Sequence, residues 1–514
     1  MNKSEKSILW VAKESFTSLV DACIQYFGDF NHSVVFVHPT EVLCQDPTYI
    51  NFVKRHPDVK IYSYTNILDS FLEKEKWQIS DLQFFLDKYQ GEIGINEIKM
   101  SSQLFTTPYH YRKYFRDLNE VEILHWTTKI FEYSEEIIMN AAPDYIFDFD
   151  NSELSRTILW VISKKCLIPY ITLEHSRYDG YILPNFSMNR KNDAFFQNEF
   201  ETIEPSLEIL KEVKKYKLRD NLANPDFRFN STLKNTRLNI TIHSRKLVQS
   251  LRSVVRKHKK IRSLPITYRD LFFIANPWKS YIHFIQGFIR ERYLLSSLNR
   301  QFVNVSSLDK YIYFPLHLIP ESSTLIKAPF YPNEKQIISH ISKILPIGFT
   351  LIVKEHGAMI GERPLSFYKE LNRLANVKCA RLDGFRDPKE WITNSHGVIT
   401  ITGTSAFEAA MLGKGAVVLG SVPFEDIDGV FKSGLDDLKV NIEKMLNYSD
   451  DNIKSCAKYI SVLKTYGEKI GFTQIHSECY LNLLRNVTQE YNNVNTSLLA
   501  SVFRKGVEIA DDFK

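Results

Sequence analysis

The feature that most constrains the fold of this chain is a series of short, almost purely apolar segments that alternate with helix-like stretches. Ser7–Ala12 (SILWVA) is the first, and a helix-like segment follows it up to Tyr26, before a second apolar run at Ser33–Val37 (SVVFV). Short apolar runs of this kind are typical of strands buried on both faces, and their alternation with helices is typical of a parallel sheet. The sequence therefore predicts an α/β fold.

The alternation occurs in two separate parts of the chain. In the first part, residues 45–135 are polar, aromatic-rich and mostly helical in pattern, and strands are predicted at 144–149 and 168–173 with a helix at 155–165 between them. Two such α/β halves predict a ligand site in a cleft at the carboxyl ends of the strands. In the second part, strands are predicted at 311–315, 349–354, 377–382, 397–402 and 416–419, and helices at 334–345, 365–374, 406–412 and over 435–485.

Length and composition agree with a globular protein. The chain has 514 residues, of which 44% are hydrophobic and 24% charged, which fits two or three domains and excludes a disordered chain, a collagen and a disulfide scaffold. Its six cysteines lack Cys-x-x-Cys spacing, which argues against a structural zinc site. The run Ile8–Ala12 is too short for a signal-peptide core, and no run of apolar residues could span a bilayer. We therefore expect a cytoplasmic protein.

Residues 237–310, called here the basic segment, differ from the rest of the chain. They hold fifteen Lys and Arg against three acids, a net charge of +12, whereas the whole chain is +5 and the remainder is therefore −7. Within it, Ala275–Leu295 carries Trp278, Ile282, Ile285 and Ile289 near helical spacing. A helix of this kind predicts association with an anionic membrane surface, the alternative being a core helix with solvated charges. No nucleic-acid-binding motif accompanies it, so we expect no nucleic-acid partner.

The segment Thr402–Ala410 (TGTSAFEAA) leads from a predicted strand through a Gly-Thr-Ser turn into a helix. Thr404 or Ser405 can cap this helix, and the backbone N–H groups of its first turn, beginning at Gly403, form an anion site with the helix dipole. Glu408 is placed to hold ribose hydroxyls beside a bound phosphate. The alternative is an ordinary capped helix in which Glu408 has a capping role.

Two more polar segments follow predicted strands of the second half. In Val353–Gly357 (VKEHG), Lys354 and His356 can donate to phosphate, His356 can protonate a leaving group, and Glu355 lies between them. The alternative there is a solvated strand end with one hydrogen-bonded histidine.

The other segment, residues 314–323 (FPLHLIPESS), places His317 and Glu321 in a loop at the same edge. A plain turn at Pro320 is its alternative reading. These three segments supply the candidate site residues at this edge of the second half.

The first half has its own polar strand ends. Residues 148–153 (DFDNSE) supply three carboxylates, of which Asp150 and Glu153 are candidates for a general base. Capping of the next helix by Asn151 or Ser152 is the alternative, and the Asp-x-Asp pair is too common to predict a metal site. After the following strand, the loop 174–181 (EHSRYDGY) supplies Glu174 and Arg177 as further candidate site residues at a strand end.

Together these motifs resemble those of the capsule polysaccharide biosynthesis proteins. The segments that carry the resemblance are PDYIFDFDNSE and ITLEHSRYDGYILP in the first half, and YIYFPLHLIPESST, LIVKEHGAMIGERPLSFYKELNRLANV and GVITITGTSAFEAAMLGKGAVVLG in the second. They lie within residues 140–185 and 311–430. The first 140 residues and the basic segment carry no such resemblance.

The resemblance implies a GT-B glycosyltransferase built of two Rossmann-like domains. Members of that family transfer 3-deoxy-D-manno-octulosonic acid (Kdo) from a CMP-activated donor to a lipid-linked acceptor at the inner membrane. By likeness, His356 lies against the donor phosphate, the Gly403–Ser405 turn binds the same region with Glu408 near the ribose, and Asp150 or Glu153 activates the acceptor. The likeness also implies a donor-binding role for His317, Glu321, Lys354 and Glu355, and an acceptor-side position for Glu174 and Arg177. Several such transferases carry His-Pro where this chain has His356–Gly357, so another CMP- or UDP-sugar is also compatible.

From these observations we expect a metal-independent glycosyltransferase without a cofactor, acting on a nucleotide sugar and a lipid-linked or oligosaccharide acceptor. A CDP-glycerol-type glycerophosphotransferase and a non-catalytic nucleotide-sugar-binding component of an export assembly are the alternatives. The expected location is the cytoplasm, with peripheral contact to the membrane. The predicted division is an acceptor-side domain at 1–235, a basic helical insertion at 236–310, a nucleotide-sugar-binding domain at 311–485 and a helical tail at 486–514.

Overall fold

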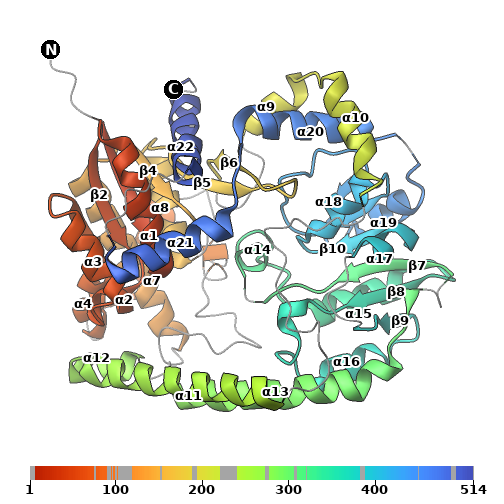
Figure 1. Cartoon of the computed structure of the whole chain (residues 1–514), viewed down its shortest axis with the longest axis horizontal. Helices are drawn as coiled ribbons and strands as arrows, with labels where there is room; N and C mark the ends of the chain where they lie inside the picture. The colour runs from red at the N-terminus through yellow and green to blue at the C-terminus, as the bar shows by residue number, and fades with distance from the viewer. Residues whose placement is uncertain are drawn as a thin grey trace.

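The computed structural model shows two α/β units, each built around a largely parallel sheet (Figure 1). This confirms the predicted α/β class with two Rossmann-like halves. The residues that the structure describes are 6–73, 77–89, 94, 97–98, 101, 119–150, 153–187, 194–219, 240–272, 277–305, 309–319, 321–382, 388–449, 451–487 and 494–512.

The first sheet has the strand order β13-β6-β5-β4-β1-β2-β3. Pairing is parallel from β3 to β5 and antiparallel at β6 and β13. The predicted loop at 174–181 therefore includes the ends of a β-hairpin. The strands are β1 (Ser7–Ala12), β2 (Asn31–Phe36), β3 (Lys60–Ser63), β4 (Tyr145–Asp148), β5 (Tyr170–His175), β6 (Tyr181–Asn185) and β13 (Glu468–Lys469).

The second sheet is parallel throughout and has the order β12-β11-β10-β7-β8-β9. Its first strand has the bounds predicted from the sequence. The strands are β7 (Tyr311–Pro315), β8 (Thr350–Lys354), β9 (Val377–Cys379), β10 (Val398–Thr400), β11 (Ala416–Val418) and β12 (Val430–Lys432).

Both sheets are buried on two faces, as their apolar strands predict. In β1, Leu9 and Val11 enter one hydrophobic cluster, whereas Ile8 and Trp10 enter the cluster on the opposite face. Successive side chains of a strand point to opposite faces, so a purely apolar strand needs helices on both sides. Helices α1 (Thr17–Ile24), α2 (Pro39–Leu43), α3 (Pro47–Arg55), α4 (Leu68–Leu72), α5 (Ile79–Lys88), α7 (Glu120–Ala141) and α8 (Leu154–Lys165) belong to the first unit.

The chain crosses between the units more often than the predicted domain boundaries allow. Strand β13 pairs with β6, α21 packs on α1 and α3, and α22 packs on β5 and β6, so the chain from residue 468 onward belongs with the first sheet. Conversely, α9 and α10 pack on α20 of the second unit. The two helices that return to the first unit are α21 (Phe472–Arg485) and α22 (Val494–Asp512). The helices of the second unit are α9 (Ala194–Thr202), α10 (Leu207–Tyr216), α14 (Ser322–Leu325), α15 (Glu334–Ile344), α16 (Leu365–Leu371), α17 (Lys389–Asn394), α18 (Thr404–Met411), α19 (Leu438–Leu446) and α20 (Ile453–Tyr466).

This crossing corrects the predicted boundaries at 235 and 485, and its cause is apolar burial. Val502 and Phe503 of α22 are fully buried in the cluster that contains Trp10 of β1. Likewise Val213 and Tyr216 of α10 are buried beside residues of α18. A helix belongs to the unit whose sheet packs against its apolar face, whatever the position of the helix along the chain.

The described part of the basic segment is helical, as predicted. Helices α11 (Ile240–Ser263), α12 (Ile266–Phe272) and α13 (Pro277–Ser296) run along one edge of the molecule, below both units in Figure 1. Leu264 joins the core of the first unit, and His283 of α13 contacts Glu362 of the second. Among the described residues, no helix has the length and apolarity that crossing a membrane requires.

Candidate functional site

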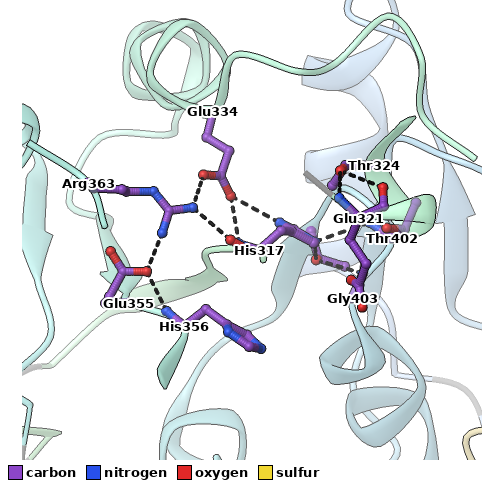
Figure 2. Close-up of polar contacts among 10 residues, drawn as sticks. His317, Glu321, Thr324, Glu334, Glu355, His356, Arg363, Thr402 and Gly403 are labelled. Atoms are coloured by element: carbon purple, nitrogen blue, oxygen red, sulfur yellow. Dashed lines mark hydrogen bonds and ion pairs between the residues drawn. The ribbon is translucent and has the colours of Figure 1, made fainter. Parts of the chain in front are cut away.

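Each sheet has one point where the strand order reverses. In the second sheet the chain runs outward from β7 to β8 and β9, and then returns to β10 on the other side of β7. Ligands of open α/β sheets bind outside the carboxyl ends of the strands at such a point. The segments that follow β7, β8 and β10 begin with His317, Glu355–His356 and Gly403, which are predicted site residues. Figure 2 shows that the fold brings them together.

His317 connects the ends of β7 and β10. Its Nε2 lies 3.0 Å from the Thr400 hydroxyl and accepts the Thr402 backbone N–H at 3.3 Å, while its Nδ1 lies 3.2 Å from Glu334 Oε1. A backbone N–H can only donate, so the ring proton must be on Nδ1. Both ring nitrogens are thus used within the protein. His317 therefore fixes the ends of β7 and β10 relative to each other, and its donor-binding role stays a prediction.

A buried arginine that the sequence analysis missed holds the site together. Arg363 is fully buried and donates to Glu334 Oε2 at 2.5 Å, to the His317 carbonyl at 2.7 Å and to Glu355 Oε1 (Figure 2). Tyr368 adds a hydrogen bond to the other Glu355 oxygen at 2.5 Å. Glu355 is therefore part of this internal network, and its donor-binding role stays a prediction.

The two carboxyl groups respond differently to the same guanidinium. Burial alone would raise the pKa of Glu334, but Arg363 and the donors on His317 outweigh it and hold the pKa below its usual value. Burial dominates at Glu355 and raises its pKa, with Arg363 and Tyr368 opposing. Buried charges of this kind are tolerated only when they are paired and hydrogen-bonded.

His356 presents a donor to the site. Its backbone N–H donates to Glu355 Oε1 at 2.6 Å, and its Nδ1 accepts the Ala358 N–H at 3.2 Å. The remaining proton of the neutral ring is therefore on Nε2, which has no hydrogen-bond partner among the described residues. Burial lowers the pKa of His356, which favours this neutral form. A ring held in this way can donate from Nε2 to a phosphate oxygen.

The N-terminus of α18 is the second candidate anion-binding element. Gly403 is its N-cap residue and no side chain caps the helix, so the predicted capping by Thr404 or Ser405 is wrong. The N–H groups of Thr404 and Ser405 have no hydrogen-bond partner in the part of the chain that the structure describes. Uncapped first-turn N–H groups together with the helix dipole attract anions. Thr400 Oγ1 fixes the turn by accepting the Gly403 N–H at 3.0 Å.

Replacement of Gly403 by Ala should weaken anion binding at this turn. A Cβ at position 403 would lie 2.5 Å from Thr400 Oγ1 and 3.4 Å from His317 Nε2, so the turn would have to shift. We expect at least a tenfold loss of nucleotide affinity, since a hydrogen bond to a charged group contributes about 1.5–3 kcal/mol. Isothermal titration measures the loss, with the nucleotide that stabilises the protein most in the thermal-shift screen described under the proposed function. Gly471→Ala is the matched control, because no atom lies within 4 Å of a Cβ there.

The other predicted donor-side residues lie around this edge. Glu408 is buried one turn into α18 and does not cap the helix. The Lys354 ammonium lies 6.0 Å from the centre of the Trp391 ring. Glu321 begins the turn into α14, where its backbone N–H donates to Thr324 Oγ1 at 3.4 Å. None of these positions by itself defines a ligand contact.

The carboxyl edge of the first sheet carries the predicted acidic cluster, tied to a second buried arginine. Arg156 lies 2.9 Å from Asp148 and 3.1 Å from Asp150, and Tyr170 donates to Asp148 at 2.7 Å. Burial raises the pKa of Asp148 to about 6, with Arg156 and Tyr170 opposing. Asp150, a predicted general base, is thus ion-paired with Arg156 in this structure. The predicted caps Asn151 and Ser152 lie outside the described residues.

Tyr170→Phe should test this interpretation of Asp148. Loss of the hydrogen bond should lower the free energy of unfolding by about 1–3 kcal/mol. A carboxyl whose folded-state pKa is raised loses stability as the pH rises through that value, so the loss should be larger at pH 8 than at pH 5. Denaturant titrations at both pH values measure it. Tyr466→Phe, which removes a hydrogen bond to the half-buried Glu199, is the control and should lower the free energy of unfolding by less.

The switch point of the first sheet lies between β1 and β4, and the backbone is strained on both sides of it. Glu14 after β1 has a φ of 47° and Glu153 after β4 a φ of 111°, values that are uncommon for residues with a side chain. Strained non-glycine residues cluster at functional sites. Glu153, a predicted catalytic residue, is buried here as the N-cap residue of α8.

Sequence analysis missed the residues on the β1 and β2 side of this edge. The Glu14 carboxylate lies 3.8 Å from His38 Nε2, and the Glu14 backbone N–H donates to the buried Glu41. Burial lowers the pKa of His38 and raises that of Glu41. A signal was present, since both residues closely follow the apolar run at Ser33–Val37. The predicted acceptor-side Glu174 is buried in β5, and Arg177 is half-buried in the hairpin turn.

No known protein-family profile matches the chain, and no curated protein matches its sequence. Among solved structures, the chain is similar to KpsC of Thermosulfurimonas dismutans, a beta Kdo 2,7 transferase, with a TM-score of 0.34 and 8% identity, covering 70% of this chain and 90% of that one. It is also similar to the UDP-GlcNAc 2-epimerase of Methanocaldococcus jannaschii in complex with UDP-GlcNAc and UDP, with a TM-score of 0.27 and 14% identity, covering 90% and 100%.

The epimerase of Neisseria meningitidis bound to UDP-GlcNAc gives a similar result, with a TM-score of 0.27 and 10% identity over 89% of this chain and 99% of that one. At these TM-scores and identities, the likeness identifies neither a family nor an activity for this chain. Only its own residues can indicate a function.

Proposed function

We propose that this chain is a glycosyltransferase that takes a sugar from a nucleotide-activated donor and adds it to a surface polysaccharide or glycolipid. The observation that carries the proposal is the pairing, at one switch point, of the His356 Nε2–H with the uncapped N-terminus of α18. Both elements donate hydrogen bonds without bringing a full positive charge. They suit an anionic phosphate that stays bound as its charge grows.

The reaction separates a sugar with oxocarbenium character from a nucleotide phosphate. Negative charge develops on that phosphate, so donors fixed in advance stabilise the transition state more than the ground state. Arg363 keeps these donors in place, because it joins the ends of β7 and β8 through His317 and Glu355. We propose that no metal ion is needed, since the helix N-terminus and His356 already supply the stabilisation.

The acceptor would bind at the carboxyl edge of the first sheet, where carboxylates can take the proton of its hydroxyl. Asp150 and Glu153, which follow β4 at this edge, are the carboxylates that we propose for this role. The proposal requires the two sheet edges to close on one pair of substrates. The resemblance of the motifs to the capsule polysaccharide biosynthesis proteins supports CMP-Kdo or a related CMP- or UDP-sugar as donor. The cytoplasmic location stays a prediction.

A thermal-shift screen of nucleotides and nucleotide sugars tests the proposal first. A ligand that binds only the folded state at about 100 times its Kd stabilises the protein by about 2.7 kcal/mol, which raises Tm measurably. We expect CMP- or UDP-sugars to stabilise the wild-type protein and to be turned over with a carbohydrate acceptor. Stabilisation and turnover by CDP-glycerol instead would show a glycerophosphotransferase. Tight nucleotide binding without any turnover would indicate a non-catalytic component.

A further inference from the structure

Helix α13 exposes four large apolar side chains to solvent, called here the α13 stripe. Trp278, Ile282, Ile289 and Tyr293 have exposed fractions of 47%, 54%, 60% and 43%. Their spacings of four, seven and four residues place them on one face of the helix. Single exposed apolar residues are common, whereas a row of large ones marks an interaction surface.

Helix α11, which packs on α13, adds positive charge beside apolar side chains. Val248, Leu251 and Val255 are exposed at 48%, 37% and 41%, and their spacing again defines one face. The same side of the helix carries exposed basic residues one turn apart. These are Arg252, Arg256, Lys259 and Arg262.

We propose that this surface docks on an anionic membrane, with α11 and α13 lying in the plane of the headgroups. An apolar stripe alone would equally suit a protein partner, but the net charge of +12 over residues 237–310 selects an anionic one. Trp278 and Tyr293 belong to the α13 stripe, and Trp and Tyr are favoured at the level of the headgroups. Neither helix is apolar enough to insert across the bilayer.

Helix α13 contacts the segment that leads into the candidate site at Arg363. His283 Nε2 lies 2.9 Å from Glu362 Oε2, and Arg290 donates to the Glu362 carbonyl at 3.3 Å. Gly361, with a φ of +87°, packs so tightly on α13 that a Cβ would lie 2.5 Å from the Gly287 carbonyl. Because Glu362, which contacts α13, is followed directly by Arg363, a membrane-bound α13 would hold the site in a fixed orientation. This suits a lipid-linked acceptor, although docking itself does not depend on the proposed function.

Flotation of the full-length protein with lipid vesicles tests the proposal. We expect binding to vesicles of phosphatidylcholine with about a third phosphatidylglycerol, little binding to phosphatidylcholine alone, and release as salt rises and shortens the Debye length. Ile282→Glu/Ile289→Glu should lower the vesicle partition coefficient at least tenfold. The same substitution at the exposed Ile347, Ile347→Glu, should leave it unchanged.

Two triple variants test how much positive charge contributes to vesicle binding. Arg252→Gln/Arg256→Gln/Lys259→Gln should lower the partition coefficient about 100-fold, since each basic residue at an anionic surface contributes about 1 kcal/mol. Lys211→Gln/Lys214→Gln/Lys215→Gln, which removes three exposed charges from α10, should have little effect.

Vesicle binding that does not change with lipid charge, with salt or with either set of variants would overturn the proposal. So would a stable dimer in light scattering that Ile282→Glu/Ile289→Glu dissociates, with no vesicle binding. Neither outcome bears on nucleotide binding in the thermal-shift screen, so the two proposals fail separately.

Discussion

Replacement of Arg363 by Met should lower the free energy of unfolding by about 3–5 kcal/mol, because removal of one partner from a buried ionic network leaves charge uncompensated. Glu334 and Glu355 would both remain buried without the guanidinium that lies between them. The His317 carbonyl would lose its donor as well. Urea titration followed by far-UV circular dichroism measures the change.

The pH dependence distinguishes this mechanism from a simple packing defect. Without Arg363, burial should raise the pKa of both carboxyl groups, and a carboxyl with a raised folded-state pKa stabilises the fold more as the pH falls. The free energy of unfolding of the variant should therefore rise as the pH falls from about 8 to about 5. The contribution of Glu334 in the wild-type protein changes in the opposite direction, because its pKa there is lowered. A loss that is the same at both pH values would contradict the network interpretation.

Arg219→Met is the control for this experiment. Arg219 lies 2.6 Å from Asp179, but both side chains are partly exposed, so the loss should stay below about 1 kcal/mol. Arg363→Lys should fall between the two, because one ammonium cannot reproduce the paired donors that a guanidinium presents to separate carboxylates.

The fold could be predicted well from the sequence because its strands are short, apolar and buried on both faces. Tyr311–Pro315 is a strand with the predicted bounds, and the alternation of strands with helices indicated parallel pairing. Strands that carry polar residues were missed, as at Lys60–Ser63 and Glu468–Lys469. The domain boundaries were wrong because no local pattern shows which sheet a distant amphipathic helix covers.

The candidate site could be predicted only in part. Residues directly after strands, such as His356 and Gly403, were found because the carboxyl edge of a parallel sheet is a general location for ligands. Arg363 was missed because its partners Glu334 and Glu355 are distant in sequence or lie in another element. The strain at Glu14 could not be seen either, since a positive φ at a non-glycine residue has no sequence signature.

Replacement of His356 by Ala should lower kcat/KM for glycosyl transfer by about 10²–10³, the usual cost of losing one preorganised donor to developing negative charge. The backbone N–H bond to Glu355 would remain, so the fold should keep most of its stability. His356→Gln should retain part of the activity, because its amide can still offer an N–H group. Initial rates with the donor found in the nucleotide screen measure the effect.

The separate effects of the substitution on kcat and KM show which state of the reaction His356 stabilises. If His356 stabilises charge that develops only in the transition state, kcat should fall while KM for the donor changes little. His396→Ala, at an exposed histidine of the same unit, should leave both constants unchanged. Because burial lowers the pKa of His356, the ring should stay neutral between pH 7 and pH 8.5, and the ratio of wild-type to variant rates should be constant over that range. A ratio that falls steeply with rising pH would instead assign His356 a protonated, charge-bearing role.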